Sequence, residues 1–314
     1  MPEASPHEGV FSIRDGDLRM DVKFVRVTDL AVHEEVIEES VDSLVIQVRN
    51  WGLLRNPVVV SERDLLVLDG THRVAAFRRL GYLWMPACVL PYSHPRVELR
   101  GWDRFLSPGA RGRGLSTFET LQTAAKDAGL ALKRVASVQS LRFFLDGRLE
   151  KAVGGARVPV AGNFLVEFRR PAEFQPELVI WEKFRLLRKL EARLAARGWS
   201  TRHVADEETE KEWAKATGEV VLLPPRAEKR DVLAVARRGF VFPPKSTRHV
   251  IPARPLHVDV PLSWVRDRRA NLSALNERLV AHLRSKRVVV LPPGQVFEGR
   301  LYAEKLFVFQ TPTG

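Results

Sequence analysis

Residues 65–81, which read LLVLDGTHRVAAFRRLG, carry the clearest structural signal in the chain. The aliphatic run 65–68 predicts a buried strand. After the turn Asp69–Gly70, apolar residues return at helical spacing until a glycine ends the pattern, at Val74, Phe77, Leu80 and Gly81. A strand that runs through a short turn into a helix predicts an α/β fold.

The segments on either side complete a small α/β unit. Strands are predicted at 22–27, 57–60 and 85–90. A helix precedes the second of these strands, because apolar residues recur at helical spacing from Val41 to Val48 and Gly52 then supplies a C-cap. Residues 22–92 therefore predict one compact nucleus with mixed helices and strands.

The rest of the chain predicts a second, larger α/β domain followed by a C-terminal extension. Helices are expected at 116–129, 176–197, 229–238 and 271–283, strands at 220–223, 288–291 and 306–309, and a hairpin at Asp146–Gly147. Residues 93–114 are rich in proline and glycine, which indicates a connection between domains. The predicted fold class is α/β (α+β), divided into an N-terminal extension (1–21), a small domain (22–104), a larger domain (105–262) and a C-terminal extension (263–314).

Length and cysteine content limit the class of protein. The chain has 314 residues, 45% of them hydrophobic, which suffices for a buried core. The single cysteine, Cys88, excludes a disulfide framework and a cysteine-based zinc site. No apolar run is long enough to cross a bilayer, and the first twenty residues lack the apolar core of a signal peptide. We therefore expect a cytoplasmic protein with no membrane partner.

The net charge is strongly positive. Fifty lysines and arginines against 38 acidic residues give +12, which favours an anionic partner such as a nucleotide, a phosphorylated metabolite or nucleic acid. The arginines are scattered through the predicted helices rather than gathered in one run, and this pattern is equally typical of an ordinary solvated surface. Charge alone does not choose among these partners.

The turn Asp69-Gly70-Thr71-His72-Arg73 has the chemistry of an anion site. It lies where a strand ends and a helix begins, so backbone N–H groups and the positive end of the helix dipole converge there. Gly70 allows close approach of a phosphate, Arg73 can bind two oxygens, and Asp69 can hold a metal ion that bridges phosphates. The alternative is a plain strand-turn-helix in which Asp69 is the N-cap.

Two further segments carry candidate functional groups. In the turn His33-Glu34-Glu35 a carboxylate can accept the proton of an attacking hydroxyl, or the two acids can merely compensate the following helix dipole. The segment 245–249, Lys-Ser-Thr-Arg-His, follows two prolines and suits a carboxylate or phosphate, or forms a basic surface loop. Trp102 is either a wall of a substrate pocket or an anchor between domains.

The order of these motifs resembles the ParB/sulfiredoxin-like superfamily. Residues 22–92 contain His-Glu, an amphipathic helix, Gly-x-x-x-x-Pro at 52–57, a strand, Asp-Gly-x-His-Arg and Leu-Gly. The superfamily includes CTP-binding partition proteins, sulfiredoxins and archaeal kinases that act on free serine. Sulfiredoxins need a cysteine where this chain has Thr71, and partition proteins continue into a helix-turn-helix region that this chain lacks. The free-serine kinases match further, with a tryptophan like Trp102 and a block like Pro244–Val250, so the resemblance spans residue 22 to about residue 262.

This resemblance implies a kinase that moves a phosphoryl group from ADP or ATP to the hydroxyl of L-serine, with Mg²⁺, and yields O-phospho-L-serine. Glu34 would be the base. The nucleotide would be held by Leu68, Asp69, Gly70, Thr71, His72 and Arg73, with Asp69 also binding the metal. Serine would be held by Trp102, Lys245, Ser246, Thr247, Arg248 and His249. Thr71 replaces a histidine common in the family, which bears on donor choice.

Two other functions stay open at this point. A nucleotide-gated, ParB-like DNA-binding protein is suggested by the first domain and the positive charge. A nuclease is the second, but the chain lacks a carboxylate cluster beyond Asp69 and Glu34–Glu35. We expect a kinase without a nucleic-acid partner. The sequence does not determine the oligomeric state, the donor, or whether the product feeds cysteine biosynthesis or another pathway.

Overall fold

The computed structural model describes residues 9–109, 117–135, 152–158, 162–168, 178–215, 218–267 and 269–311. The chain divides into two compact units, one formed by Met1–Glu98 with His249–Gly314 and the other by Leu99–Arg248. This division differs from the predicted domains. Residues 249–262 and the predicted C-terminal extension both lie in the same unit as the N-terminal segment. The predicted α/β (α+β) fold class is confirmed.

The first unit is built on a five-stranded mixed sheet of order β1-β2-β6-β4-β5. Its strands are β1 (Phe11–Asp15), β2 (Leu18–Arg26), β4 (Val58–Ser61), β5 (Val67–Asp69) and β6 (Trp84–Leu90). β4 and β6 are parallel, and the other neighbours are antiparallel. Every residue of β6 is buried, as expected for the continuous apolar run of a central strand. Part of the predicted N-terminal extension is thus a sheet element, because β1 and the start of β2 lie within residues 1–21.

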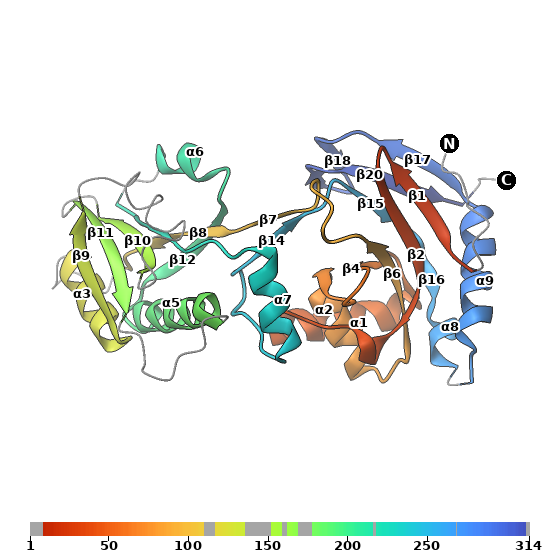
Figure 1. Ribbon diagram of the computed structural model, residues 1–314, viewed down its shortest axis with the longest axis horizontal. Helices are drawn as coiled ribbons and strands as arrows, with labels where there is room; N and C mark the ends of the chain where they lie inside the picture. The colour runs from red at the N-terminus through yellow and green to blue at the C-terminus, as the bar shows by residue number, and fades with distance from the viewer. Residues whose placement is uncertain are drawn as a thin grey trace. The chain divides into compact units, whose positions relative to one another are not determined.

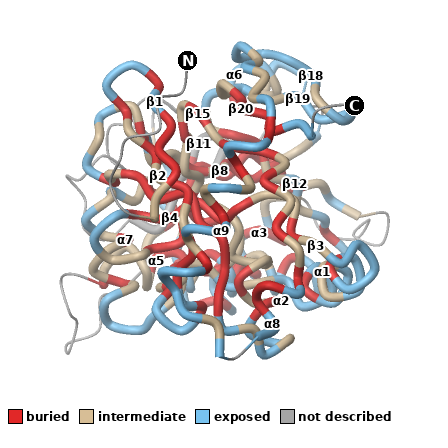
Figure 2. Tube along the Cα trace, turned by 90° about the vertical axis from the view of Figure 1, so that its right-hand side faces the viewer, coloured by how far each residue is buried: buried red, intermediate tan, exposed pale blue. Residues whose placement is uncertain are grey.

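Two helices of this unit frame the Asp69 turn. These are α1 (Glu38–Trp51) and α2 (Thr71–Arg79), and a short 3₁₀ helix covers Val27–Asp29. α1 ends as predicted, because Gly52 adopts φ 68° and its N–H donates to the Val48 carbonyl at 3.1 Å. The two helices pack against each other, and Figure 2 shows that much of α1 is exposed whereas β2 and β4 are largely buried.

The C-terminal residues are an integral part of the first unit. They form β15 (Ala253–Leu256), β16 (Val260–Pro261), α8 (Leu262–Arg266), α9 (Leu272–Arg284), β17 (Arg287–Leu291), β18 (Gln295–Phe297), β19 (Arg300–Tyr302) and β20 (Lys305–Gln310). β20 is the middle strand of the sheet β15-β20-β17, and β16 pairs with β3 (Leu53–Leu54). Helix α9 packs on β1 and β2 (Figure 1). Lys305 forms an ion pair with the buried carboxylate of Asp15.

The second unit contains a six-stranded antiparallel sheet of order β12-β8-β13-β10-β11-β9. The strands are β8 (Trp102–Ser107), β9 (Leu130–Val135), β10 (Ala152–Val158), β11 (Gly162–Phe168), β12 (Ser200–Ala205) and β13 (Val220–Leu223). The helices are α3 (Thr117–Asp127), α5 (Val179–Ala195), α6 (Thr209–Trp213) and α7 (Lys229–Arg237). The chain passes between the units in β7 (Glu98–Arg100) and β14 (Arg248–Val250).

Helix α5 shows why this sheet has a helical layer. Its buried residues include Phe184, Leu187, Leu190 and Leu194, which recur at helical spacing and form one apolar stripe. α5 packs against α3 and against β10 and β12. The predicted hairpin at Asp146–Gly147 lies outside the described residues. Within the described part of the chain, no helix has both the length and the apolarity that crossing a membrane requires.

Candidate active site

The Asp69 turn joins β5 to α2 through Gly70, whose backbone conformation favours glycine. Gly70 is the N-cap of α2 and adopts φ 102°, a region that side chains rarely tolerate. A Cβ at this position would lie 2.7 Å from Val58 Cγ1 and 2.8 Å from an Arg73 nitrogen. No side chain caps the helix start, so Asp69 is not the N-cap that the plain strand-turn-helix alternative requires. The first turn of α2 keeps its N–H groups available for an anion at this end.

Asp69 is held by arginines from two distant segments. Its Oδ2 accepts hydrogen bonds from Arg73 at 2.7 Å and from Arg254 at 3.1 Å. Burial disfavours the charged carboxylate, but the positive charges of Arg254, Arg73 and Arg300 outweigh this effect and lower the pKa of Asp69 to about 2. The carboxylate is therefore ionised at every physiological pH and organises an arginine cluster around itself.

Arg73 has a different local role from the one that the sequence suggests. Besides Asp69, its guanidinium donates to the backbone carbonyls of Asn56 and Pro57, at 2.8 and 2.7 Å. These bonds tie α2 to the loop that follows α1. Arg73 thus holds the backbone of the site in place and also contributes positive charge to it.

The Glu34 turn lies beside the Asp69 turn. Ala31 pairs with the strand edge at Leu66, and the Ile37 N–H donates to His72 Nε2 at 3.0 Å. His33 is buried, and its ring meets the ring of His249 edge to face at 5.0 Å. His249 Nε2 is hydrogen-bonded to the Tyr92 hydroxyl at 2.8 Å. The first unit therefore brings the turn that carries Glu34 close to His72, the Asp69 turn and His249.

The remaining residues of the loop 245–249 lie in the second unit, around Trp102. The ammonium of Lys245 lies 4.5 Å from the centre of the indole ring and the guanidinium of Arg248 lies 5.6 Å from it. Trp102 Nε1 donates to the Thr247 carbonyl at 3.1 Å, and Ser246 Oγ donates to the Pro243 carbonyl at 2.7 Å. Trp102 thus organises the four residues that precede His249.

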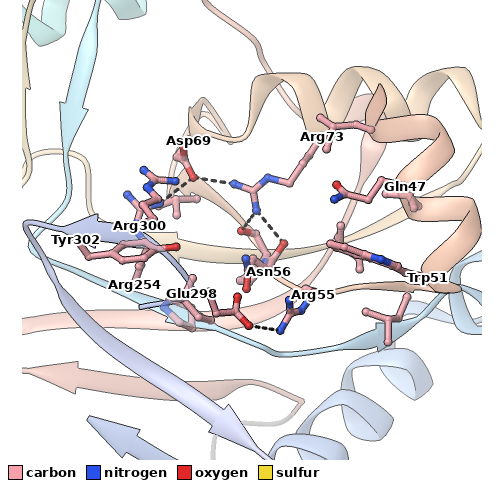
Figure 3. A pocket seen from close by; sticks show the side chains of 18 residues that line it. Gln47, Trp51, Arg55, Asn56, Asp69, Arg73, Arg254, Glu298, Arg300 and Tyr302 are labelled. Atoms are coloured by element: carbon pink, nitrogen blue, oxygen red, sulfur yellow. Dashed lines mark hydrogen bonds and ion pairs between the residues drawn. The ribbon is translucent and has the colours of Figure 1, made fainter. Parts of the chain in front are cut away.

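A pocket of about 310 Å³ opens next to Asp69, within the range of small-molecule sites. Figure 3 shows its two chemically different ends. Asp69, Arg254, Arg300 and Tyr302 form a charged end, whereas Gln47 and Trp51 of α1 lie at the other, with the Arg55 guanidinium 5.6 Å from the centre of the Trp51 ring. Leu44, Val48 and Leu54 add apolar surface to the lining. Cationic groups at one end and an aromatic ring with aliphatic side chains at the other suit a nucleotide, with its phosphates and its base respectively.

Several lining residues have no counterpart in the sequence prediction: Gln47, Trp51, Arg55, Asn56, Arg254, Glu298, Arg300 and Tyr302. Arg55 and Asn56 fall inside the Gly-x-x-x-x-Pro pattern at 52–57, so that pattern contained a usable signal. Arg254 follows the recognised 244–250 block by four residues. No local signal marks Glu298, Arg300 or Tyr302, because their role depends on tertiary packing.

Asp69 is the candidate carboxylate ligand for a magnesium ion. In the described residues no three His, Cys, Asp or Glu side chains gather as a metal site. Mg²⁺ commonly binds through only one or two carboxylates together with substrate phosphates, and this mode needs no larger cluster. Both arginine contacts use Asp69 Oδ2, and neither of them uses Oδ1. A single-carboxylate site that a phosphate completes is therefore compatible with these residues.

His33 gives the unit a predictable response to acid. Its side chain is 2% exposed, and burial lowers the pKa of its imidazole to about 4, against a smaller opposing effect of a hydrogen bond with the backbone of Val67. An unfolded histidine titrates near pH 6.5. Because only the unfolded state binds this proton between those values, the free energy of unfolding falls as the pH drops from about 6.5 to about 4, by about 3 kcal/mol.

We expect urea unfolding at several pH values between 7 and 4 to reveal this loss in the wild type. His33→Gln cannot take up the proton, so its unfolding free energy should depend less on pH across the same window. Equal pH dependence in the two proteins would assign the acid response to other groups.

The fold is that of the free serine kinases: a solved free serine kinase in complex with ADP superposes with a TM-score of 0.62 at 20% identity, covering 78% of this chain and 94% of that chain. No protein-family model matches the chain.

In sequence, an ADP-dependent L-serine kinase of Thermococcus kodakarensis is 23% identical, over 78% of this chain and 93% of its own length. Other relatives are named ATP-dependent L-serine kinases. A ParB-like protein of Sulfolobus acidocaldarius is 24% identical, over 73% of this chain and 90% of its own length. The predicted resemblance to archaeal free-serine kinases is confirmed.

Proposed function

We propose that the protein is a kinase that transfers a phosphoryl group from ADP or ATP to the hydroxyl of free L-serine, releasing O-phospho-L-serine with AMP or ADP. The observation that carries this proposal is the pocket at the Asp69 turn, which has a cationic and an apolar end and lies in a chain similar to L-serine kinases. The same turn adjoins a carboxylate suited to act as a base.

The nucleotide occupies the pocket, with its phosphates toward the N-terminus of α2. Asp69 and Arg73 line the pocket at this end. Leu68, Gly70, Thr71 and His72 belong to the same turn and complete the phosphate-binding residues of this proposal, with Gly70 allowing close approach of the backbone. When bound at Asp69, Mg²⁺ neutralises phosphate charge. Arg254, already directed at Asp69, adds positive charge to the same end.

Glu34 acts on the acceptor. Its carboxylate takes the proton of the serine hydroxyl as that oxygen forms its bond to the transferred phosphorus and the bond to the leaving phosphate breaks. Trp102, Lys245, Ser246, Thr247, Arg248 and His249 serve as the serine-binding residues in this scheme. The cationic groups of the loop suit the serine carboxylate, which a guanidinium can bind through two hydrogen bonds.

The direct test is to incubate the purified protein with Mg²⁺ and free L-serine, separately with ADP and with ATP, and to follow the products by phosphorus NMR. We expect phosphoserine and an equal amount of AMP or ADP, which identifies the donor. Absence of phosphoserine with both donors, at a temperature where the protein is folded, would remove the serine assignment. A cytoplasmic location and a link to cysteine biosynthesis remain part of the proposal and need cellular experiments.

The second candidate is a nucleotide-gated DNA-binding protein. The net charge of +12 and the similarity to a ParB-like protein favour it. It requires duplex affinity that depends on the nucleotide and persists at moderate salt, whereas incidental contacts with a basic surface weaken steeply as salt rises. Binding of a labelled duplex at two salt concentrations, with and without nucleotide, separates the two cases.

A further inference from the structure

The hairpin of β18 and β19, residues 295–302, forms one wall of the pocket. Glu298, Arg300 and Tyr302 line the pocket from this side, and Gln47 and Trp51 of α1 line it from another part of the chain. In Figure 3, Arg300 and Tyr302 lie with Asp69 and Arg254 at the charged end. The C-terminal residues that no sequence motif explains thus contribute directly to the candidate nucleotide site.

The hairpin presents two different faces because successive residues of a strand point to opposite sides. Arg300 and Tyr302 are two residues apart and share the pocket face. Val296 and Leu301 pair across the strands, are 68% and 66% exposed, and lie on the other face. Because of this register, the Arg300 side chain faces the pocket and the Leu301 side chain faces away from it.

The turn of the hairpin is anchored to the opposite side of the pocket. Glu298 and Gly299 form a tight turn with φ 48° and 76°. Glu298 Oε1 accepts a hydrogen bond from Arg55 at 2.8 Å, and Oε2 lies 3.2 Å from His257 Nε2. The ring of Phe297 also contacts the His257 ring, with centroids 5.2 Å apart. These contacts hold the hairpin over the pocket without using the arginine cluster.

The charged end has one more cation than it has carboxylates. Arg73 and Arg254 both pair with Asp69, and Arg254 also pairs with Glu304. Arg300 is close enough to Asp69 to act on its charge, yet the one contact of its side chain within the described residues is with the Tyr302 ring, at 4.8 Å. Three arginines against two carboxylates leave a positive charge, and Arg300 is the group best placed to give it to an anion.

We propose that the β18–β19 hairpin is part of the nucleotide site and that Arg300 binds the phosphates of the donor. This inference rests on the proposed nucleotide function and extends it to residues beyond the serine-kinase motifs. The base end of the pocket is built by α1, so Arg300 acts on the phosphates and not on the nucleoside. The effect of removing it therefore grows with the number of phosphates on the ligand.

The test is titration calorimetry of the full-length protein with ADP, AMP and adenosine. Arg300→Ala should weaken ADP binding about tenfold or more, since a charge-assisted hydrogen bond is lost, and should leave adenosine binding unchanged. Arg300→Lys keeps the charge but loses the planar, two-pronged geometry, so its affinity for ADP should be intermediate. The side chain is exposed, and thermal unfolding should confirm that both variants fold as the wild type does.

Arg287→Ala is the matched control, because Arg287 is an exposed arginine of β17, in the same C-terminal segment, that does not line the pocket. It should bind ADP as the wild type does. Equal ADP affinity in wild type and Arg300→Ala would overturn the inference and leave the nucleotide function standing. Equal losses for ADP and adenosine, or for Arg287→Ala and Arg300→Ala, would also overturn it. A wild-type protein that binds no nucleotide would overturn the proposed function and this inference together.

Discussion

Replacing Glu34 by glutamine is expected to lower kcat for phosphoserine formation about 100- to 10 000-fold, the range that a positioned general base contributes. The amide keeps the size of the side chain but cannot accept the serine proton. The turn that carries residue 34 is fixed by backbone bonds at Ala31 and by the Ile37–His72 hydrogen bond, so the variant should fold normally. ADP affinity should remain close to the wild-type value.

The control for this prediction is the neighbouring Glu35→Gln. Glu35 is an exposed residue of the same turn, and its loss changes the net charge by the same amount. It should leave kcat within about twofold of the wild type, since surface substitutions away from special features have small effects. If Glu34→Gln retained full activity, or if Glu35→Gln lost as much, Glu34 would not be the base. A steady-state assay of both variants with saturating serine and donor makes the comparison.

Gly70→Ala is expected to be the most damaging small substitution in the first unit. The added methyl meets Val58 Cγ1 at 2.7 Å on a buried strand, and the backbone φ of 102° is strained for alanine. Together the strain and the overlap should cost about 2–5 kcal/mol in the free energy of unfolding. The same displacement moves the start of α2, so ADP affinity should fall in whatever protein remains folded.

Gly81→Ala separates the two contributions to that loss. Gly81 follows the other end of α2 and has φ 69°, but a Cβ there would meet nothing within 4 Å. Only the backbone strain of about 1–2 kcal/mol should appear, with ADP affinity unchanged. Urea unfolding of the two variants beside the wild type makes the measurement. If Gly70→Ala and Gly81→Ala lost the same free energy of unfolding, close packing at the Asp69 turn would contribute nothing to the effect of Gly70→Ala.

Much of the fold could be predicted from local patterns. The helix from Glu38 to Trp51, its glycine cap, the strand before Asp69 and the helix after it all appear where periodicity indicates them. These elements are predictable because the residues that determine them are neighbours in the chain. The interpretation of residues 1–21 as an extension was wrong. Local patterns do not reveal β1, because this strand is stabilised mainly by pairing with β2 and by packing against distant residues such as Phe309.

The structure brings some of the predicted site residues together. The turn that carries Glu34 lies next to the Asp69 turn in the first unit, through the contacts of Ala31 with Leu66, Ile37 with His72 and His33 with His249. Trp102 and Lys245 lie together in the second unit, joined by a cation–π contact that no sequence pattern specifies. The catalytic and binding roles of these residues remain predictions, and the Glu34→Gln and Gly70→Ala variants test two of them.

By itself the sequence determined the strand-turn-helix at residues 65–81 and the resemblance to free-serine kinases. The first depends on the identity and spacing of neighbouring residues, and the second on the order of motifs along the chain. Only the tertiary structure decided what surrounds Asp69. Arg254 reaches it across 185 residues of chain, and Arg300 approaches through a hairpin anchored by Arg55 and Glu298. Such contacts depend on how separate sheets pack, because the chain order of these arginines carries no information about their distance in space.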